Sequence, residues 1–145
     1  QVMNLRLNGI NACYLNSAQD EQEKQETKTL IERGQVKLVY VSPEGLLSGN
    51  LTSFFKNLNI SLIAIDEAHC VSQWGHEFRS DYMRLGELKN IFPNVPVLAL
   101  TATADEKTRK DIALQLNMNE PKTFISSFDR PNIKYKITER ANELD

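Results

Sequence analysis

Three short apolar runs limit what this sequence can fold into more than any other feature. They occupy residues 36–41, 62–65 and 97–100, and most of their residues are β-branched or aliphatic. They lack the strict alternation of a half-exposed strand, so they are typical of strands covered on both faces. Residues 10–15 and 123–126 are weaker strand candidates. None of these runs is long enough to cross a membrane, so no membrane partner is expected.

Helix signals fill the stretches between these runs. Ser17, followed three residues later by Asp20, predicts a capping box, and Gly34 predicts the end of the same helix. Pro43 directly after Ser42 predicts a second helix start, because proline is favoured at the first helical position.

Two more helices are expected further along the chain. Thr103 with Glu106 predicts a second capping box, opening a helix that runs through Ile112 and Leu116. An apolar stripe with helical spacing, ended by Pro93, comprises Tyr82, Leu85, Leu88, Ile91 and Phe92. Strands and helices that alternate in this way predict an α/β fold with a mostly parallel sheet and helices on both faces. Ligands of such sheets bind beyond the carboxyl ends of the strands.

Composition narrows the class of protein. The chain has 145 residues, of which 41% are hydrophobic and 25% charged, enough apolar mass for one folded domain. A formal net charge of −2 argues against a protein whose whole surface attracts nucleic acid. Two cysteines exclude a disulfide framework, and no signal peptide opens the chain, so an intracellular location is expected.

Two carboxylates stand at the end of the second apolar run. Asp66 and Glu67 follow residues 62–65 directly, and such a pair is costly at a strand end unless a cation binds there. Mg²⁺ with a nucleotide phosphate is the usual partner. Asp66 would hold the metal through water, Glu67 would polarise the attacking water, and His69 would report the state of the site. The alternative is a solvated turn in which Asp66 caps the next helix.

A zinc site is the second alternative for this segment. His69, Cys70 and His76 are possible ligands. Structural zinc prefers four ligands in spaced Cys and His pairs, and the chain offers no second pair here. We therefore expect no zinc site.

An aromatic segment follows the carboxylates. It contains the only tryptophan of the chain, Trp74, together with Gly75, His76, Phe78 and Arg79. Exposed aromatic rings beside arginine are surfaces on which single-stranded bases stack. The alternative is that Trp74 and Phe78, four residues apart, form the buried face of a helix. Gly75 between them weakens the helix alternative, but composition alone leaves both open.

These residues carry a resemblance to a known family. Residues 66–79, Asp-Glu-Ala-His-Cys-Val-Ser-Gln-Trp-Gly-His-Glu-Phe-Arg, resemble motif II and the aromatic-rich loop of RecQ-family DNA helicases in superfamily two. Residues 40–44 resemble the motif Ib region, and residues 98–104 resemble motif III. Residues 127–133 resemble the passage into the second RecA-like domain of that family.

The resemblance implies a fold and a domain boundary. The fold would be a three-layer RecA-like domain of the P-loop NTPase type, truncated at its N-terminus. Residues 1–126 would be an incomplete first helicase ATP-binding domain, and residues 127–145 the linker and start of the second. The six glycines form no Gly-rich loop ending in Lys-Ser/Thr, so the phosphate-binding part is expected to lie before residue 1.

The resemblance also implies an activity. The parent would be an ATP- and Mg²⁺-dependent 3′–5′ DNA helicase that couples hydrolysis to unwinding in recombination and repair. It would act on single-stranded DNA and duplex junctions, in the bacterial cytoplasm and nucleoid or in the eukaryotic nucleus. By this resemblance the catalytic residues are Glu67, Asp66 and His69, the coupling residues Gln73, Thr101 and Thr103, and the DNA-binding residues Trp74, Phe78, Arg79 and His76. The threonine hydroxyls would hydrogen-bond motif II.

Two departures and one alternative accompany this interpretation. Gly45 stands where the family usually has a basic residue, and Ser80 replaces a common proline, although neither position touches the carboxylates. The alternative function is a non-catalytic DNA- or protein-binding module derived from a helicase core. The fragment alone is expected to lack ATPase activity, because a nucleotide site needs its phosphate loop. An exposed sheet edge would also favour self-association.

Overall fold

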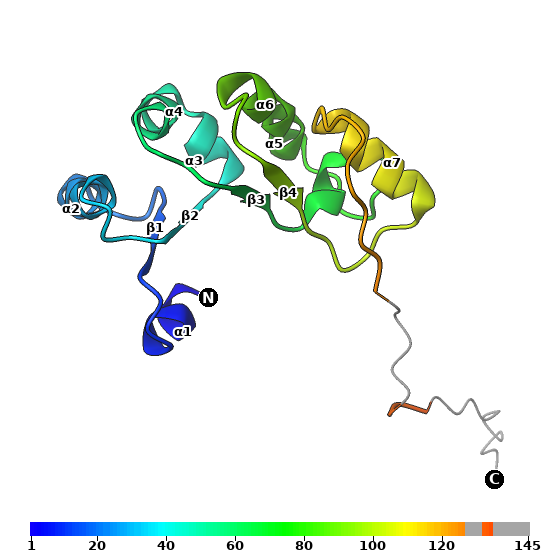
Figure 1. Cartoon of the computed structure of the whole chain (residues 1–145), viewed down its shortest axis with the longest axis horizontal. Coiled ribbons are helices and arrows are strands. Elements are labelled where there is room, and N and C mark those ends of the chain that lie inside the picture. The colour runs from blue at the N-terminus through cyan, green and yellow to red at the C-terminus, as the bar shows by residue number, and fades with distance from the viewer. Residues whose placement is uncertain (127–131, 135–145) are drawn as a thin grey trace, which may run out of the picture.

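Two small parallel sheets form the framework of the chain (Figure 1). The computed structural model describes residues 1–126 and 132–134. In the first sheet β1 (Ala12–Leu15) pairs with β2 (Leu38–Val41), and in the second β3 (Ile63–Ile65) pairs with β4 (Val97–Ala99). Both pairs are parallel, so the predicted α/β fold with parallel strands is confirmed, and the weaker candidate at residues 10–15 is a strand.

The other weak candidate, at residues 123–126, is not a strand. Phe124 is 88% exposed and Ile125 is 64% exposed, so no strand within the described residues covers this segment. The prediction rested on local β propensity, which means little without a pairing partner. The predicted domain boundary and the start of the second domain fall on residues 127–131 and 135–145, outside the described residues.

Helices connect the strands and follow them. Parallel strands need such crossovers, and α2 makes one between β1 and β2. The helical elements are α1 (Val2–Leu7), α2 (Glu21–Glu32), α3 (Pro43–Leu47), α4 (Gly49–Lys56), the 3₁₀ turn η1 (Ala68–Val71), α5 (Ser80–Met83), the 3₁₀ turn η2 (Arg84–Glu87), α6 (Leu88–Ile91) and α7 (Glu106–Gln115).

The observed start of α2 differs from the predicted one, whereas its end and the start of α3 agree with the prediction. The capping box of α2 is formed by Asp20 and Glu23, not by Ser17 and Asp20. Both pairs satisfy the same spacing, and the pair adjacent to the amphipathic run is the one used. The predicted end is confirmed, because Gly34 has a φ of +68° directly after the last turn. The predicted start at Ser42 is also confirmed, since its hydroxyl accepts the Gly45 N–H with Pro43 at the first position.

The start of α7 is corrected in the same way. Its N-cap is Asp105, whose carboxylate accepts the Thr108 N–H at 2.7 Å, so the predicted box of Thr103 with Glu106 is wrong. Aspartate is a stronger cap than threonine and stands one residue before the helix. Thr103 lies two residues further back, in the segment between β4 and α7.

The apolar stripe after residue 80 is confirmed, although its helix is not uniform. Helical turns run from α5 through η2 to α6, with 3₁₀ geometry in the middle. Leu85, Leu88 and Phe92 are buried in the core. The last turn ends before Pro93, as the sequence predicts.

The sheets bury one face more fully than the other. Leu15 and Ile65 are buried in a core shared with the helices, and Figure 1 shows α3 to α6 in a row along one side of the strands. On the opposite face Tyr14 is 43% exposed and Leu98 is 40% exposed. Within the described residues a third layer is therefore not evident. None of the helices described there is both long and apolar enough to span a membrane.

Candidate functional site

The two carboxylates lie at the carboxyl end of the second sheet. β3 ends at Ile65, and the ladder continues past it, because the Leu100 N–H donates to Ile65 and the Ala68 N–H donates to Leu100, both at 2.8 Å. Asp66 and Glu67 between them are exposed. The parallel pair thus holds both carboxylates at the edge where ligands of α/β sheets bind.

Glu67 has an uncommon backbone conformation. Its φ of +50° lies in the left-handed region, which costs a non-glycine residue roughly 1–2 kcal/mol. Asp66 supports the turn, since its Oδ1 accepts the Glu67 N–H at 3.0 Å. The η1 turn follows at once, and Glu67 Oε2 lies 3.4 Å from His69 Nδ1. Backbone strain of this kind is found where a side chain must be held in one place.

His69 joins the two strand ends. It is buried, and its Nδ1 lies 3.0 Å from the hydroxyl of Thr101, which follows β4. That hydroxyl also lies 3.3 Å from the carbonyl oxygen and from the N–H of Thr103. The ring of His69 stacks on His76 with centroids 4.6 Å apart, and its Nε2 has no partner among the described residues. The imidazole therefore contacts three segments, through Glu67 after β3, Thr101 after β4 and His76 in the aromatic loop.

The aromatic segment is a loop, and the helix alternative is wrong. Residues 72–79 form turns, with Trp74 62% exposed and Phe78 42% exposed. The loop closes at its base, where the Arg79 N–H donates to Cys70 at 3.0 Å. Gly75 packs against the backbone, and a Cβ there would collide with the carbonyl oxygen of His69. The two aromatic rings are therefore presented outwards from a tightly packed base.

Helix α7 holds this loop through contacts that the sequence did not reveal. Ser72 is fully buried, and its hydroxyl donates to Asp111 Oδ2 at 2.6 Å while accepting the Trp74 N–H at 3.1 Å. The Ser72 hydrogen bond is the main cause of the lowered pKa of Asp111. Lys107, one turn earlier on the helix, places its Nζ 3.1 Å from the centroid of the Trp74 ring.

A cavity of about 320 Å³ lies between the carboxylates, the loop and the segment after β4. Several predicted residues from three sequence segments meet around it, and its full lining is Glu67, His69, Cys70, His76, Glu77, Arg79, Tyr82, Ala102 and Thr103. Asp66, Gln73, Trp74, Phe78 and Thr101 are not part of this lining.

One cluster in this cavity has potential metal ligands. His69, Cys70 and Glu77 each offer one ligand atom within 4.8 Å of the others. Burial raises the pKa of the Cys70 thiol, which disfavours the thiolate that zinc requires. Three ligands also fall short of a closed structural site. That the chain holds no zinc stays a prediction.

The residues of this site lie within a region that matches a known protein family. The DEAD/DEAH box helicase family matches residues 1–112, which include the carboxylates, the loop and the segment after β4. The chain belongs to the DEAD/DEAH box helicase family. The Asp-Glu-Ala-His sequence of the DEAH box is formed in this chain by residues 66–69.

Individual relatives of this chain include proteins named RecQ. It is 48% and 46% identical to proteins named ATP-dependent DNA helicase RecQ from Pasteurella multocida and Haemophilus influenzae, over 100% of its own length and 23% of theirs. It is 40% identical to the mouse bifunctional 3′-5′ exonuclease/ATP-dependent helicase WRN over 99% of its length and 10% of that protein. The resemblance to RecQ helicases is thereby confirmed, and the chain spans about a quarter of the bacterial relatives.

The predicted residues of this helicase chain fall into two groups. The first group is joined by contacts and comprises Asp66, Glu67, His69, His76 and Thr101, with Thr103 reached through its backbone. Only one of the two threonine hydroxyls, that of Thr101, makes the expected bond to motif II among the described contacts. The second group lies outwards, with Gln73, Trp74, Phe78 and Arg79 all exposed.

Proposed function

We propose that this chain is part of an ATP-dependent 3′–5′ DNA helicase of RecQ type, an enzyme that couples ATP hydrolysis to unwinding in recombination and repair. The names of its relatives support an ATP-dependent reaction on DNA. Single-stranded DNA and its junction with duplex would be the substrate, so the enzyme would work inside cells, where DNA is held.

Asp66 and Glu67 have the chemistry that this reaction needs. Mg²⁺ prefers oxygen ligands and keeps several waters, and the exposed Asp66 carboxylate fits such an ion together with ATP phosphates. Bound Mg²⁺ would neutralise the charge that develops on the phosphates. Glu67 would accept the proton of the attacking water, and its strained turn keeps its carboxylate beside His69.

The contact chain Glu67–His69–Thr101 carries the proposal. It joins the carboxylate to the buried imidazole, and the imidazole stacks on His76 of the aromatic loop. A change in the loop would therefore reach the catalytic carboxylate through one side chain. The Thr103 backbone borders the same path through Thr101. Gln73, which is exposed in the loop between Ser72 and Trp74, is proposed to act with it.

The loop supplies the proposed DNA contact. Trp74 and Phe78 are exposed rings, and Arg79 follows Phe78 directly in the chain. Arg79 and His76 of the same loop line the cavity. Base stacking on such rings contributes roughly 1–3 kcal/mol per base and is tolerant of sequence. This agrees with the near-neutral net charge of the chain, since stacking needs no large basic surface.

The experiment is Glu67→Gln in the complete protein. The amide keeps the shape of the side chain but accepts no proton, so we expect ATP and DNA binding to persist while hydrolysis falls by about 10²–10⁴-fold. Glu77→Gln is the matched control, because Glu77 lines the same cavity and is ten residues from the box glutamate. Unimpaired hydrolysis in Glu67→Gln would contradict the proposal.

The isolated 145-residue chain is proposed to bind without turnover. Its sequence contains no Gly-rich loop ending in Lys-Ser/Thr, the usual cradle for nucleotide phosphates. Purified alone, the chain should show no DNA-dependent ATP hydrolysis. Measurable hydrolysis that disappears in Glu67→Gln would contradict this expectation.

A further inference from the structure

Helix α7 contacts the aromatic loop through a buried hydroxyl. The Ser72 side chain has no exposure to solvent, and its hydroxyl joins Asp111 of the helix to the backbone N–H of Trp74. The O···O distance of 2.6 Å is that of a charge-assisted hydrogen bond, which is shorter and stronger than a neutral one. The backbone at Trp74 is thus tied to α7.

A second contact lies one helical turn earlier. Lys107 and Asp111 are four residues apart, so they share one face of α7. The Lys107 ammonium lies 3.1 Å from the Trp74 ring centroid and covers one face of the indole. A nucleotide base that stacks on that face must displace the ammonium, because both occupy the same surface of the ring.

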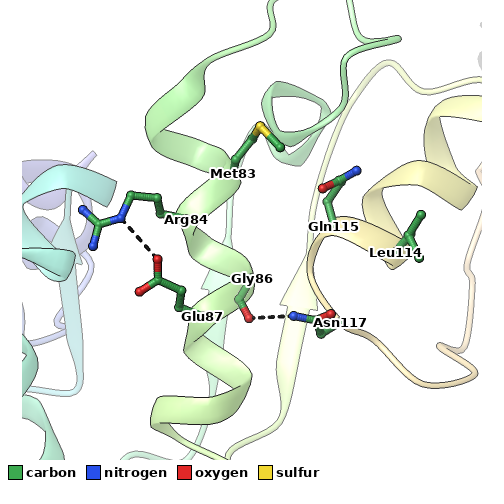
Figure 2. A pocket seen from close by; sticks show the side chains of 7 residues that line it. All are labelled: Met83, Arg84, Gly86, Glu87, Leu114, Gln115 and Asn117. Atoms are coloured by element: carbon green, nitrogen blue, oxygen red, sulfur yellow. Dashed lines mark hydrogen bonds and ion pairs between the residues drawn. The ribbon is translucent and has the colours of Figure 1, made fainter.

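Helix α7 is itself firmly placed. Ile112 and Leu116 are buried in the core. At its far end the Asn117 side chain donates to the Gly86 carbonyl at 3.0 Å, and Figure 2 shows this bond bridging the helix that contains Gly86 and the end of α7. A Cβ at Gly86 would collide with the Gln115 carbonyl oxygen, so the two elements approach closely. α7 is therefore an anchor and not a mobile neighbour of the loop.

We propose that α7 positions the aromatic loop for DNA sensing. Asp111 fixes the loop through Ser72, and Lys107 covers the Trp74 ring until a base of single-stranded DNA replaces it. This inference rests on the proposed function of the loop. Because the segment with Thr101 and Thr103 leads directly into α7, the helix gives the loop a second connection to His69.

The first test measures ATP hydrolysis by the complete protein with and without single-stranded DNA. Asp111→Ala removes the acceptor of the Ser72 hydroxyl, and we expect the DNA-stimulated rate to fall roughly tenfold or more, with the DNA-free rate unchanged. Asp111→Asn retains an acceptor oxygen and should restore most of the stimulation. Gln115→Ala is the matched control, since it removes only the donor to the other oxygen of Asp111 and should behave as wild type.

A double-mutant comparison separates positioning from general stability. Ser72→Ala should lose at least as much stimulation as Asp111→Ala, because it removes the hydroxyl–carboxylate bond and also the acceptor of the Trp74 N–H. The double variant should be no worse than Ser72→Ala alone, since both substitutions remove the same hydroxyl–carboxylate bond. Additive losses, or equal losses of the DNA-free and DNA-stimulated rates, would overturn the proposal.

The second test follows Trp74 fluorescence without DNA. The Trp74 signal is the fluorescence of each protein minus the fluorescence of the same protein that also carries Trp74→Phe. Lys107→Ala should raise quenching by acrylamide up to about twofold, because it uncovers one of the two ring faces. Lys110→Ala removes the same charge from α7 at a lysine that pairs with Glu106, and should leave quenching unchanged. Equal quenching in the two variants would overturn the role of Lys107.

These outcomes distinguish the two proposals. A wild-type protein whose hydrolysis does not respond to DNA would contradict the proposed function of the loop. A wild-type protein that responds, with Asp111→Ala responding equally well, would contradict only the role of α7.

Discussion

Gly75 shows most clearly how single residues shape this site. It lies between the exposed Trp74 and the stacked His76, and its backbone packs against the carbonyl groups of His69 and Ser72. A Cβ would collide with the His69 carbonyl oxygen, so only glycine allows the loop to close over η1.

Replacing Gly75 with alanine should lower the free energy of unfolding by about 1–3 kcal/mol, the usual cost of overpacking. Urea unfolding of both proteins measures this change. Gly49→Ala is the matched control, because a Cβ at Gly49 has nothing within 4 Å and alanine favours the helix that starts there. Equal stability of Gly75→Ala and wild type would show that the loop base is not closely packed.

Sequence reasoning found the site residues that stand together in the chain. Asp66, Glu67 and His69 directly follow the apolar run at residues 62–65. The strand predicted for that run therefore places them at the carboxyl end of the sheet. Ser72 and Asp111 were missed because they are 39 residues apart, and no pattern in either segment signals the hydrogen bond between them. Lys107 was missed for the same reason, since a lysine on an exposed helix face is ordinarily solvated.

At the scale of elements, the sequence predicted strands and helices well and their starts less well. All three strong apolar runs contain strands, because buried parallel strands are apolar almost throughout. Two capping boxes were placed three and two residues too early, at Ser17 and Thr103, because spacing alone does not say which polar residue adjoins the first turn. The strand expected at residues 123–126 failed because strand formation depends on a partner.

The element-scale prediction concerns the start of α2. Asp20→Ala removes the acceptor of the Glu23 N–H and should cost about 1 kcal/mol of stability. Ser17→Ala changes the residue that spacing alone would choose and should leave stability unchanged. Thermal or urea unfolding checks both, and a larger loss for Ser17→Ala than for Asp20→Ala would contradict the assigned cap.

At the scale of the whole molecule, the second face of the sheets is the main departure from expectation. Leu98 at the centre of β4 is exposed, although the apolar run at residues 97–100 predicts cover on both faces. Tyr14 of β1, in the weaker strand candidate, is exposed as well. Figure 1 shows α3 to α6 along one side of the strands and only the short α1 on the other side, where it contacts β1. The described helices therefore leave part of this second face uncovered. Self-association of the isolated chain, expected from an exposed sheet edge, stays a prediction.

The central claim spans the whole molecule, because it connects DNA at the loop to ATP at the carboxylates. The exposed Trp74 ring marks one end of that connection, and the contacts of His69 with Glu67 and Thr101 mark the other. If the claim holds, removing the ring should affect the response to DNA and not the hydrolytic chemistry itself.

The most direct test is the ratio of ATP hydrolysis rates with and without single-stranded DNA in the complete protein carrying Trp74→Ala. We expect the ratio to fall about 5- to 150-fold, the loss that corresponds to roughly 1–3 kcal/mol of base stacking. Trp74→Phe keeps an aromatic surface and should retain most of the stimulation. A ratio in Trp74→Ala equal to that of the wild type would contradict the account.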